Sequence, residues 1–161
     1  MSASIGAEAR QRLLAEIRHH GELDQETGGF LLARAEDPDR LTCLALAADL
    51  GITRKRELFI VSGGALERLF TWATESEMRV RAQYHSHRRG AFLSPTDIEH
   101  GFSVEGFVTS VIPHYLAPPH GPDEWGWWRC SGGEWLRTTA PAVDERPTAV
   151  VAFDEEGVRE L

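Results

Sequence analysis

Residues 78–87, MRVRAQYHSH, alternate apolar and polar side chains with a period of two. This period is typical of a half-buried β-strand, and the even-numbered positions from Met78 to Tyr84 would form its apolar face. His85 and His87 stand at positions i and i+2, so both imidazoles point to the same, polar side of the strand. Two imidazoles on one side can converge on a single ion. The stretch therefore predicts a strand that ends in a metal-binding pair.

The chain around this stretch mixes helix and strand patterns. Apolar positions at helical spacing predict one helix within residues 6–19 and a second, amphipathic helix after Gly63 and Gly64. Apolar runs predict further strands at Phe30–Ala33, Leu41–Ala48, Leu58–Val61 and Phe107–Ile112. Hairpins are predicted from the first two of these runs and from residues 125–129 with 134–137. Strands mixed with a few helices indicate an α/β or α+β fold.

The whole chain is interpreted as one domain. Its 161 residues suffice for a single hydrophobic core, and no internal repeat or linker divides them. We place the core at about residues 8–137 and treat 138–161 as a C-terminal extension. Within that extension, residues 138–147 are expected to be irregular, and residues 148–153 form either a last strand or a tail.

Composition excludes several classes of partner. The formal net charge is -8, which argues against nucleic acid and against an anionic membrane surface. No apolar run approaches the roughly 20 residues of a membrane span, and the first twenty residues lack the apolar core of a signal peptide. A cytoplasmic location is expected. Cys43 and Cys130 form no C-x-x-C pattern, so neither a cysteine metal site nor a disulfide framework is predicted.

A third metal ligand is needed beside the two histidines, and Asp97 is the best candidate. A catalytic zinc site keeps three protein ligands and leaves the fourth position to water. Ser94-Pro95-Thr96-Asp97 combines an N-cap serine, a proline at the first helical position and an acid at the third. The segment could therefore be a helix cap and nothing more. Alternatively, a short loop after His87 could return this helix start to the metal.

Glu26 is the candidate general base. A zinc hydrolase needs a group that takes a proton from the metal-bound water. Glu26 precedes Gly28 and Gly29 and the strand predicted from Phe30. Most glutamates at strand starts are simply solvated, so Glu26 indicates a catalytic base only in combination with the histidine pair and Asp97.

Taken together, these elements resemble the JAMM motif of the JAB/MPN metalloprotease family. That motif has an upstream glutamate, then His-Ser/Thr-His, then a loop and Ser-x-x-Asp, and this chain has Glu26, His85-Ser86-His87 and Ser94-Pro95-Thr96-Asp97 in that order. The resemblance covers about residues 8–137. It implies a mixed central β-sheet flanked by helices, with a topology like that of cytidine deaminases.

The resemblance also implies a role for each matching residue. His85, His87 and Asp97 would hold one zinc ion per chain. Glu26 would act as the general acid and base, and Ser94 would donate a hydrogen bond to the developing oxyanion. The chain departs from the family pattern in having six residues between His87 and Ser94, where seven are common, and in lacking a proline after His87.

The implied activity is that of a deubiquitinase-like zinc isopeptidase or peptidase. It would cleave after the C-terminal tail of a ubiquitin-like modifier or sulfur-carrier protein, a tail usually held as an added strand. Two alternatives are a non-catalytic MPN-like scaffold and a zinc hydrolase of a small molecule. A zinc deaminase would need a P-C-x-x-C element, which this chain lacks. The need for a partner protein or a homodimer stays open.

Two arginines directly follow the histidine pair. Arg88 and Arg89 could contact an acidic partner, or they could be solvated loop charges. The sequence does not distinguish these two interpretations.

Overall fold

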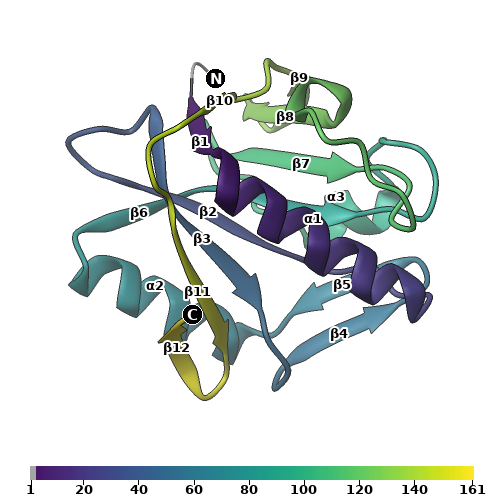
Figure 1. Ribbon diagram of the computed structural model, residues 1–161, viewed down its shortest axis with the longest axis horizontal. Coiled ribbons are helices and arrows are strands. Elements are labelled where there is room, and N and C mark those ends of the chain that lie inside the picture. The colour runs from purple at the N-terminus through teal and green to yellow at the C-terminus, as the bar shows by residue number, and fades with distance from the viewer. Residues whose placement is uncertain (1–2) are drawn as a thin grey trace.

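A curled ten-stranded mixed sheet forms the centre of the molecule (Figure 1). The computed structural model describes residues 3–161. The sheet contains β1 (Ser4–Gly6), β2 (Gly28–Arg34), β3 (Arg40–Ala47), β6 (Met78–Ser86), β7 (Val108–Ile112), β8 (Gly126–Ser131), β9 (Glu134–Arg137), β10 (Ala142–Asp144), β11 (Ala149–Asp154) and β12 (Gly157–Glu160). The remaining elements are the hairpin of β4 (Ile52–Lys55) and β5 (Leu58–Val61), the helices α1 (Ala7–Glu22), α2 (Gly63–Glu75) and α3 (Pro95–His100), and the 3-10 turn η1 (Pro122–Glu124).

Each face of the sheet carries its own hydrophobic core, because side chains along a strand alternate between faces. In β2, Leu31 packs with Leu13 and Ile17 of α1. Its neighbours Phe30 and Leu32 belong to a second core. That second core contains Ala65, Leu69 and Ala73 of α2. The strand is buried on both faces, which explains why it appears in the sequence as a continuous apolar run.

Most of the predicted elements are present in the structure. The predicted helices correspond to α1 and α2, and β2 pairs antiparallel with β3 as expected for a hairpin. The hairpin of β8 and β9 is also confirmed. The sequence patterns missed four short strands of three or four residues each, namely β1, β4, β10 and β12. No helix within residues 3–161 has the length and apolar character that crossing a membrane requires.

The alternation predicted along β6 is wrong for its first half. Leu31 of β2 pairs with Ala82, but Leu32 pairs with Val80, so a β-bulge leaves Arg81 as an extra residue. A bulge shifts the side-chain alternation by one position. Val80 and Met78 therefore pack against the α2 core, while Ala82 belongs to the α1 core. The i and i+2 relation of the two histidines lies beyond the bulge and is unaffected.

Residues 138–161 supply strands to the main sheet. β11 lies parallel to β3, with Val151 opposite Ala45 and Phe153 opposite Ala47, and β10 lies parallel to β1. The description of this segment as an extension outside the core therefore needs correction, because Val151 and Phe153 are buried in the core under α2. The last-strand interpretation of residues 148–153 is the one that the structure adopts. Residues 1 and 2 of the predicted domain lie outside the described residues.

The histidine strand lies next to a parallel neighbour. β6 and β7 run in the same direction, with Ser86 opposite Ile112 at their carboxyl ends. The connection between them, residues 87–107, contains α3 and must return the chain to the end of the sheet at which β7 begins. In open sheets of this kind, ligands bind outside the carboxyl ends of the strands. The fold thus leaves the end of β6 as the place for a site.

Candidate metal centre

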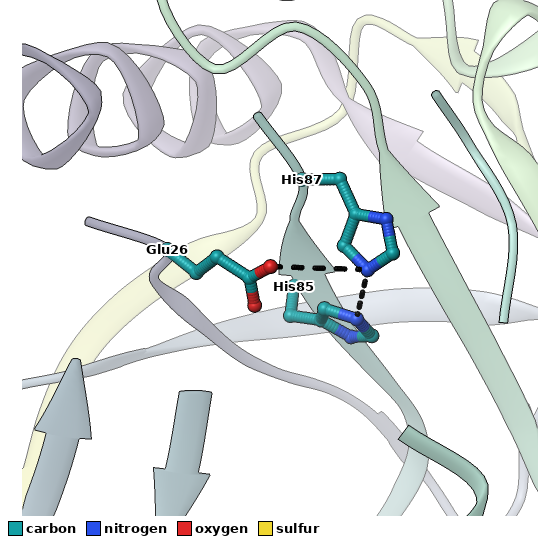
Figure 2. A group of neighbouring side chains, drawn as sticks. All are labelled: Glu26, His85 and His87. Carbon is teal, nitrogen blue, oxygen red and sulfur yellow. Dashed lines mark hydrogen bonds and ion pairs between the residues drawn. The ribbon is translucent and has the colours of Figure 1, made fainter. Parts of the chain in front are cut away.

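The two histidines lie at the carboxyl end of β6 with a ring nitrogen of each directed toward the other (Figure 2). Their Nε2 atoms are 3.2 Å apart. Both residues are buried, with 6% of His85 and 5% of His87 exposed. The His87 backbone is held by its own N–H, which donates to the carbonyl of Ile112 at the end of β7. Parallel pairing of β6 with β7 therefore fixes the backbone that carries His87.

Asp97 meets both imidazoles from the first turn of α3. Its Oδ1 lies 3.1 Å from Nε2 of His85, and its Oδ2 lies 3.0 Å from Nε2 of His87. Burial raises the pKa of the Asp97 carboxyl, but hydrogen bonds from the two histidines outweigh this effect, and the pKa lies well below its usual range. The six-residue loop from Arg88 to Leu93 is thus long enough to return the carboxylate to the histidine pair.

The donor atoms of this cluster fit a metal ion. Nδ1 of His87 lies 3.0 Å from the Gly90 carbonyl, which can only accept, so we assign the ring proton to Nδ1. Nε2 of the same ring faces the Asp97 carboxylate at 3.0 Å, so it would be placed to bind a metal ion held between the two side chains. In a tetrahedral site with bonds of about 2.0–2.1 Å, ligand atoms lie about 3.3 Å apart. The three separations of 3.0, 3.1 and 3.2 Å are close to that value.

Glu26 approaches the histidine pair from the start of β2 (Figure 2). Its Oε1 lies 3.9 Å from Nε2 of His87, and only 4% of the residue is exposed. Glu26, His85 and His87 each have a potential ligand atom within 4.8 Å of the others, so this buried group could itself hold a metal ion. Asp97 lies nearer to both histidines than Glu26 lies to His87. Of the two carboxylates, Asp97 is therefore the better placed to complete a ligand set with the histidines.

The protonation of Glu26 is shifted by its surroundings. Burial, followed by the negative charges of Asp97 and Glu57, raises the pKa of the Glu26 carboxyl to about 8. A carboxyl group in this range can both accept and release a proton near neutral pH. The environment therefore favours a proton on Glu26 more than on an ordinary carboxylate.

The backbone beside Glu26 is held against the histidine strand. The Glu26 N–H donates to the carbonyl of Lys55 at 2.8 Å. The N–H of Thr27 donates to Oγ of Ser86 at 2.9 Å, and the Ser86 N–H donates to the Thr27 carbonyl at 2.8 Å. Ser86, the residue between the two histidines, thus ties the segment that carries Glu26 to the end of β6.

Arg54 is a supporting residue that the sequence did not indicate. Its Nε donates to Oγ1 of Thr27 at 2.9 Å, and its two Nη atoms donate to the carbonyls of Ala47 at 2.6 Å and Ala48 at 2.7 Å. Burial, the largest influence, lowers the pKa of this guanidinium. An arginine within a short strand has no local signal that marks such a position. The role of Arg54 becomes visible only in the tertiary structure, where β4 packs against the residues before β2 and at the end of β3.

Ser94 is the N-cap residue of α3, as the sequence predicted. Its Oγ accepts from the Asp97 N–H at 3.1 Å, while Asp97 Oδ2 accepts from the Ser94 N–H at 2.9 Å, which completes a capping box. A hydroxyl has one donor and two acceptor positions. The cap uses only an acceptor position of Ser94, so its O–H remains available as a donor. Asp97 likewise contributes both to the cap and to the histidine cluster.

A pocket of about 550 Å³ opens over the cluster. Glu26, His87 and Ser94 line it, together with Phe92, whose ring lies edge-on to His87 with centroids 4.8 Å apart. The volume suits a short peptide segment or a small ligand. A larger hollow of about 810 Å³ between α2 and β12 has no histidine in its lining and lies apart from this chemistry. Three of the five candidate residues thus line one pocket, and the other two, His85 and Asp97, contact His87.

Comparisons with known proteins identify the class of fold. The chain matches the crystal structure of a JAB1/MPN domain protein from Archaeoglobus fulgidus with a TM-score of 0.51 and 14% identity, over 89% of this chain and 98% of that one. The protein therefore has an MPN-like fold, a mixed sheet flanked by helices.

Two further structures, both solved in solution, share the fold. A protein from Desulfitobacterium hafniense gives a TM-score of 0.67 at 15% identity, covering 90% of this chain and 94% of that one. A protein from Salinibacter ruber gives 0.53 at 23% identity, with the same coverage of 90% and 94%. No family profile and no curated protein sequence matches the chain. At these identities the likeness concerns the fold alone.

Proposed function

We propose that this protein is a zinc-dependent peptidase or isopeptidase of the JAMM type. The observation that carries the proposal is the meeting of His85, His87 and Asp97 within 3.0–3.2 Å at the end of β6, with Glu26 beside them. The MPN-like fold and the buried, metal-competent cluster support a hydrolase rather than a scaffold that has lost its ligands.

The side chains around the cluster supply the steps of amide hydrolysis. A zinc ion held by His85, His87 and Asp97 would supply a Lewis acid and lower the pKa of water to about 7. Glu26 takes the proton of the attacking water and delivers it to the leaving amine. The free O–H of Ser94 donates to the carbonyl oxygen as that atom gains negative charge. The bond that breaks is the amide C–N bond.

For the substrate, we propose the C-terminal tail of a ubiquitin-like or sulfur-carrier protein. An extended tail is commonly held as an added strand along the edge of a sheet. The β4–β5 hairpin forms a separate two-stranded sheet, and Glu57 in its turn lines the pocket over the cluster. A strand edge beside an open pocket suits a flexible chain end as substrate better than it suits the surface of a folded protein.

The proposal is tested first on the metal. Elemental analysis of the wild-type protein should give near-stoichiometric zinc, and His85→Ala and Asp97→Ala should each abolish it. Arg79→Ala, an exposed substitution earlier on β6, is the matched control and should keep the metal. A folded wild type that takes up no zinc after supplementation would contradict the metal centre and leave the scaffold interpretation.

Cleavage is tested on fusions of ubiquitin-like and sulfur-carrier tails to a reporter. Wild type should release the reporter, whereas Glu26→Gln should bind zinc and remain inactive. Zinc binding without cleavage of any such fusion would reject the proposed substrate while leaving the metal centre intact, and would favour a small-molecule hydrolase.

A further inference from the structure

The pocket over the cluster has a cationic wall on an otherwise acidic protein. Arg88 and Arg89 both line it, although the chain as a whole has a formal net charge of -8. Both arginines are exposed, so their guanidinium groups can be reached from solvent. Glu57 is the other exposed charged residue of the lining, and neither arginine forms an ion pair with it. A pocket wall with this charge favours an anionic ligand.

The backbone that carries these arginines is held in place at several points. The Tyr115 N–H donates to the His87 carbonyl at 3.0 Å, and the His114 N–H donates to the Arg89 carbonyl at 2.9 Å. The ring of His87 bonds the carbonyl of Gly90 at 3.0 Å. The two arginines therefore sit on an ordered turn, which lowers the entropic cost of using them as binding groups.

Arg89 has no partner of its own within residues 3–161, where its side chain forms neither a hydrogen bond nor an ion pair. Arg88 contributes only a longer-range charge near Asp24, and that carboxylate already accepts from Tyr115 and pairs with Arg56. A guanidinium presents a planar fork of donors that matches a carboxylate, and here the fork of Arg89 remains available.

We propose that Arg89, assisted by Arg88, forms a carboxylate-binding subsite beside the metal centre. This inference rests on the proposed function and adds a feature of the substrate, namely a carboxylate close to the scissile bond. Arg89 follows the proposed ligand His87 by two residues, a backbone span of at most ~7 Å. Because Arg89 and His87 line the same pocket, a carboxylate bound by Arg89 would lie close to the reacting carbonyl. The carboxylate belongs either to an acidic side chain or to a chain terminus.

Binding of short peptides tests the subsite without requiring turnover. The probes are N-acetyl-Gly-Gly-Asp-amide against its Asn counterpart, and N-acetyl-Gly-Gly-Gly as the free acid against its amide. Titrations into zinc-supplemented protein are followed by NMR, including the arginine Nε–H signals. For at least one pair, the acid should bind about tenfold more tightly than the neutral partner. The pair that shows the preference identifies the source of the carboxylate.

The variants decide whether Arg89 is the cause. Arg89→Ala should remove the preference for the acid, Arg89→Lys should retain part of it, and Arg12→Ala on the exposed side of α1 should leave it unchanged. Equal binding of acid and neutral probes by the wild type would overturn the subsite. A preference that persists in Arg89→Ala would do the same, because the acid would then be binding at the metal cluster. A wild-type protein that bound no zinc or cleaved no tail fusion would instead count against the proposed function. Failure of the subsite and failure of the proposed function can therefore be told apart.

Discussion

Ser94 shows how a single hydroxyl can contribute to local structure and to chemistry. Its oxygen accepts from the Asp97 N–H, and that bond positions the same aspartate that meets both histidines. The proton of the hydroxyl is not used by the cap, and the residue lines the pocket. Because an N-cap tolerates some residues that lack a hydroxyl, the two functions can be separated by substitution.

Ser94→Gly should separate them most clearly. Glycine at an N-cap costs only a few tenths of a kcal/mol, so thermal stability should stay near that of the wild type, whereas kcat for a tail fusion should fall about 10²–10³-fold. Ser94→Ala should show the same fall in kcat and should also lose about 1 kcal/mol of unfolding free energy. Ser94→Thr keeps the hydroxyl and should retain most activity. An unchanged kcat in Ser94→Gly would limit this residue to capping.

Arg54 should matter for catalysis without touching the substrate. Arg54→Ala removes its bonds to Thr27, Ala47 and Ala48 and should cost about 1–3 kcal/mol of stability. Because Thr27 adjoins Glu26, kcat should fall more than KM rises, while zinc content stays constant. Arg54→Lys should recover part of kcat, and the exposed Arg79→Ala should change neither parameter. A drop in stability with an unaltered kcat would show that Arg54 only supports the fold.

At the level of elements, the β6 strand carries the site and also departs from its own sequence pattern. The bulge at Arg81 turns Met78 and Val80 toward the α2 core and leaves Ala82 and Tyr84 on the α1 side. A simple alternation assigns all four to one face. The sequence does not reveal the bulge, because both faces of the strand require apolar residues. The alternation of apolar and polar residues is therefore the same with or without the bulge.

Asp154 connects the turn between β11 and β12 to the segment that follows β3. Its carboxylate accepts from the N–H of Glu156 at 2.9 Å and from the N–H of Asp49 at 3.3 Å. Burial acts to raise the pKa of Asp154, but these N–H groups, that of Leu50 and the charge of Arg159 lower it, and the net pKa is below its ordinary value. A carboxyl with a lowered folded-state pKa stabilises the fold above its unfolded-state pKa, about 3.9.

Asp154→Asn should therefore cost about 1–2 kcal/mol of unfolding free energy at pH 7. The difference from wild type should shrink as pH falls below about 4, through the folded-state pKa, because the wild-type carboxylate becomes protonated. Chemical denaturation at pH 7 and at lower pH measures this. Glu156→Gln, an exposed change in the same turn, is the control. A difference that stays constant with pH would rule out the charge of Asp154 as its cause.

On the scale of the whole molecule, the C-terminal segment is part of the folding unit. β11 extends the edge of β3 beyond the point where β1 pairs with it, and Phe153 is fully buried beside Phe30, with ring centroids 5.7 Å apart. Removing these strands would expose both the edge of β3 and the core under α2.

A chain that ends at Arg137 should consequently fail to fold cooperatively. Near-ultraviolet circular dichroism and thermal melts should show the loss of fixed packing, whereas removal of Leu161 alone should leave the melt close to that of the full chain. A sharp melting transition in the truncated chain would restore the view of residues 138–161 as an extension outside the core.

Local patterns were enough to specify the helices α1 and α2, the β2–β3 and β8–β9 hairpins, the histidine pair and the cap at Ser94. Each of these depends on residues close together in the chain, whose spacing follows from the geometry of a helix, a strand or a turn. Metal-ligand chemistry then suggested that the histidines belong with Asp97 and Glu26, and the structure brings these four together.

The tertiary structure alone decided the rest. It placed Thr27 against Ser86, 59 positions away, and directed Arg54 toward the backbone around Glu26. It also inserted β11 beside β3 and introduced the bulge in β6. Finally, it left Arg89 unpaired at the pocket. These features come from contacts between distant segments. They depend on which surfaces meet when the two cores close on the sheet, and such contacts have no periodic signature in the sequence.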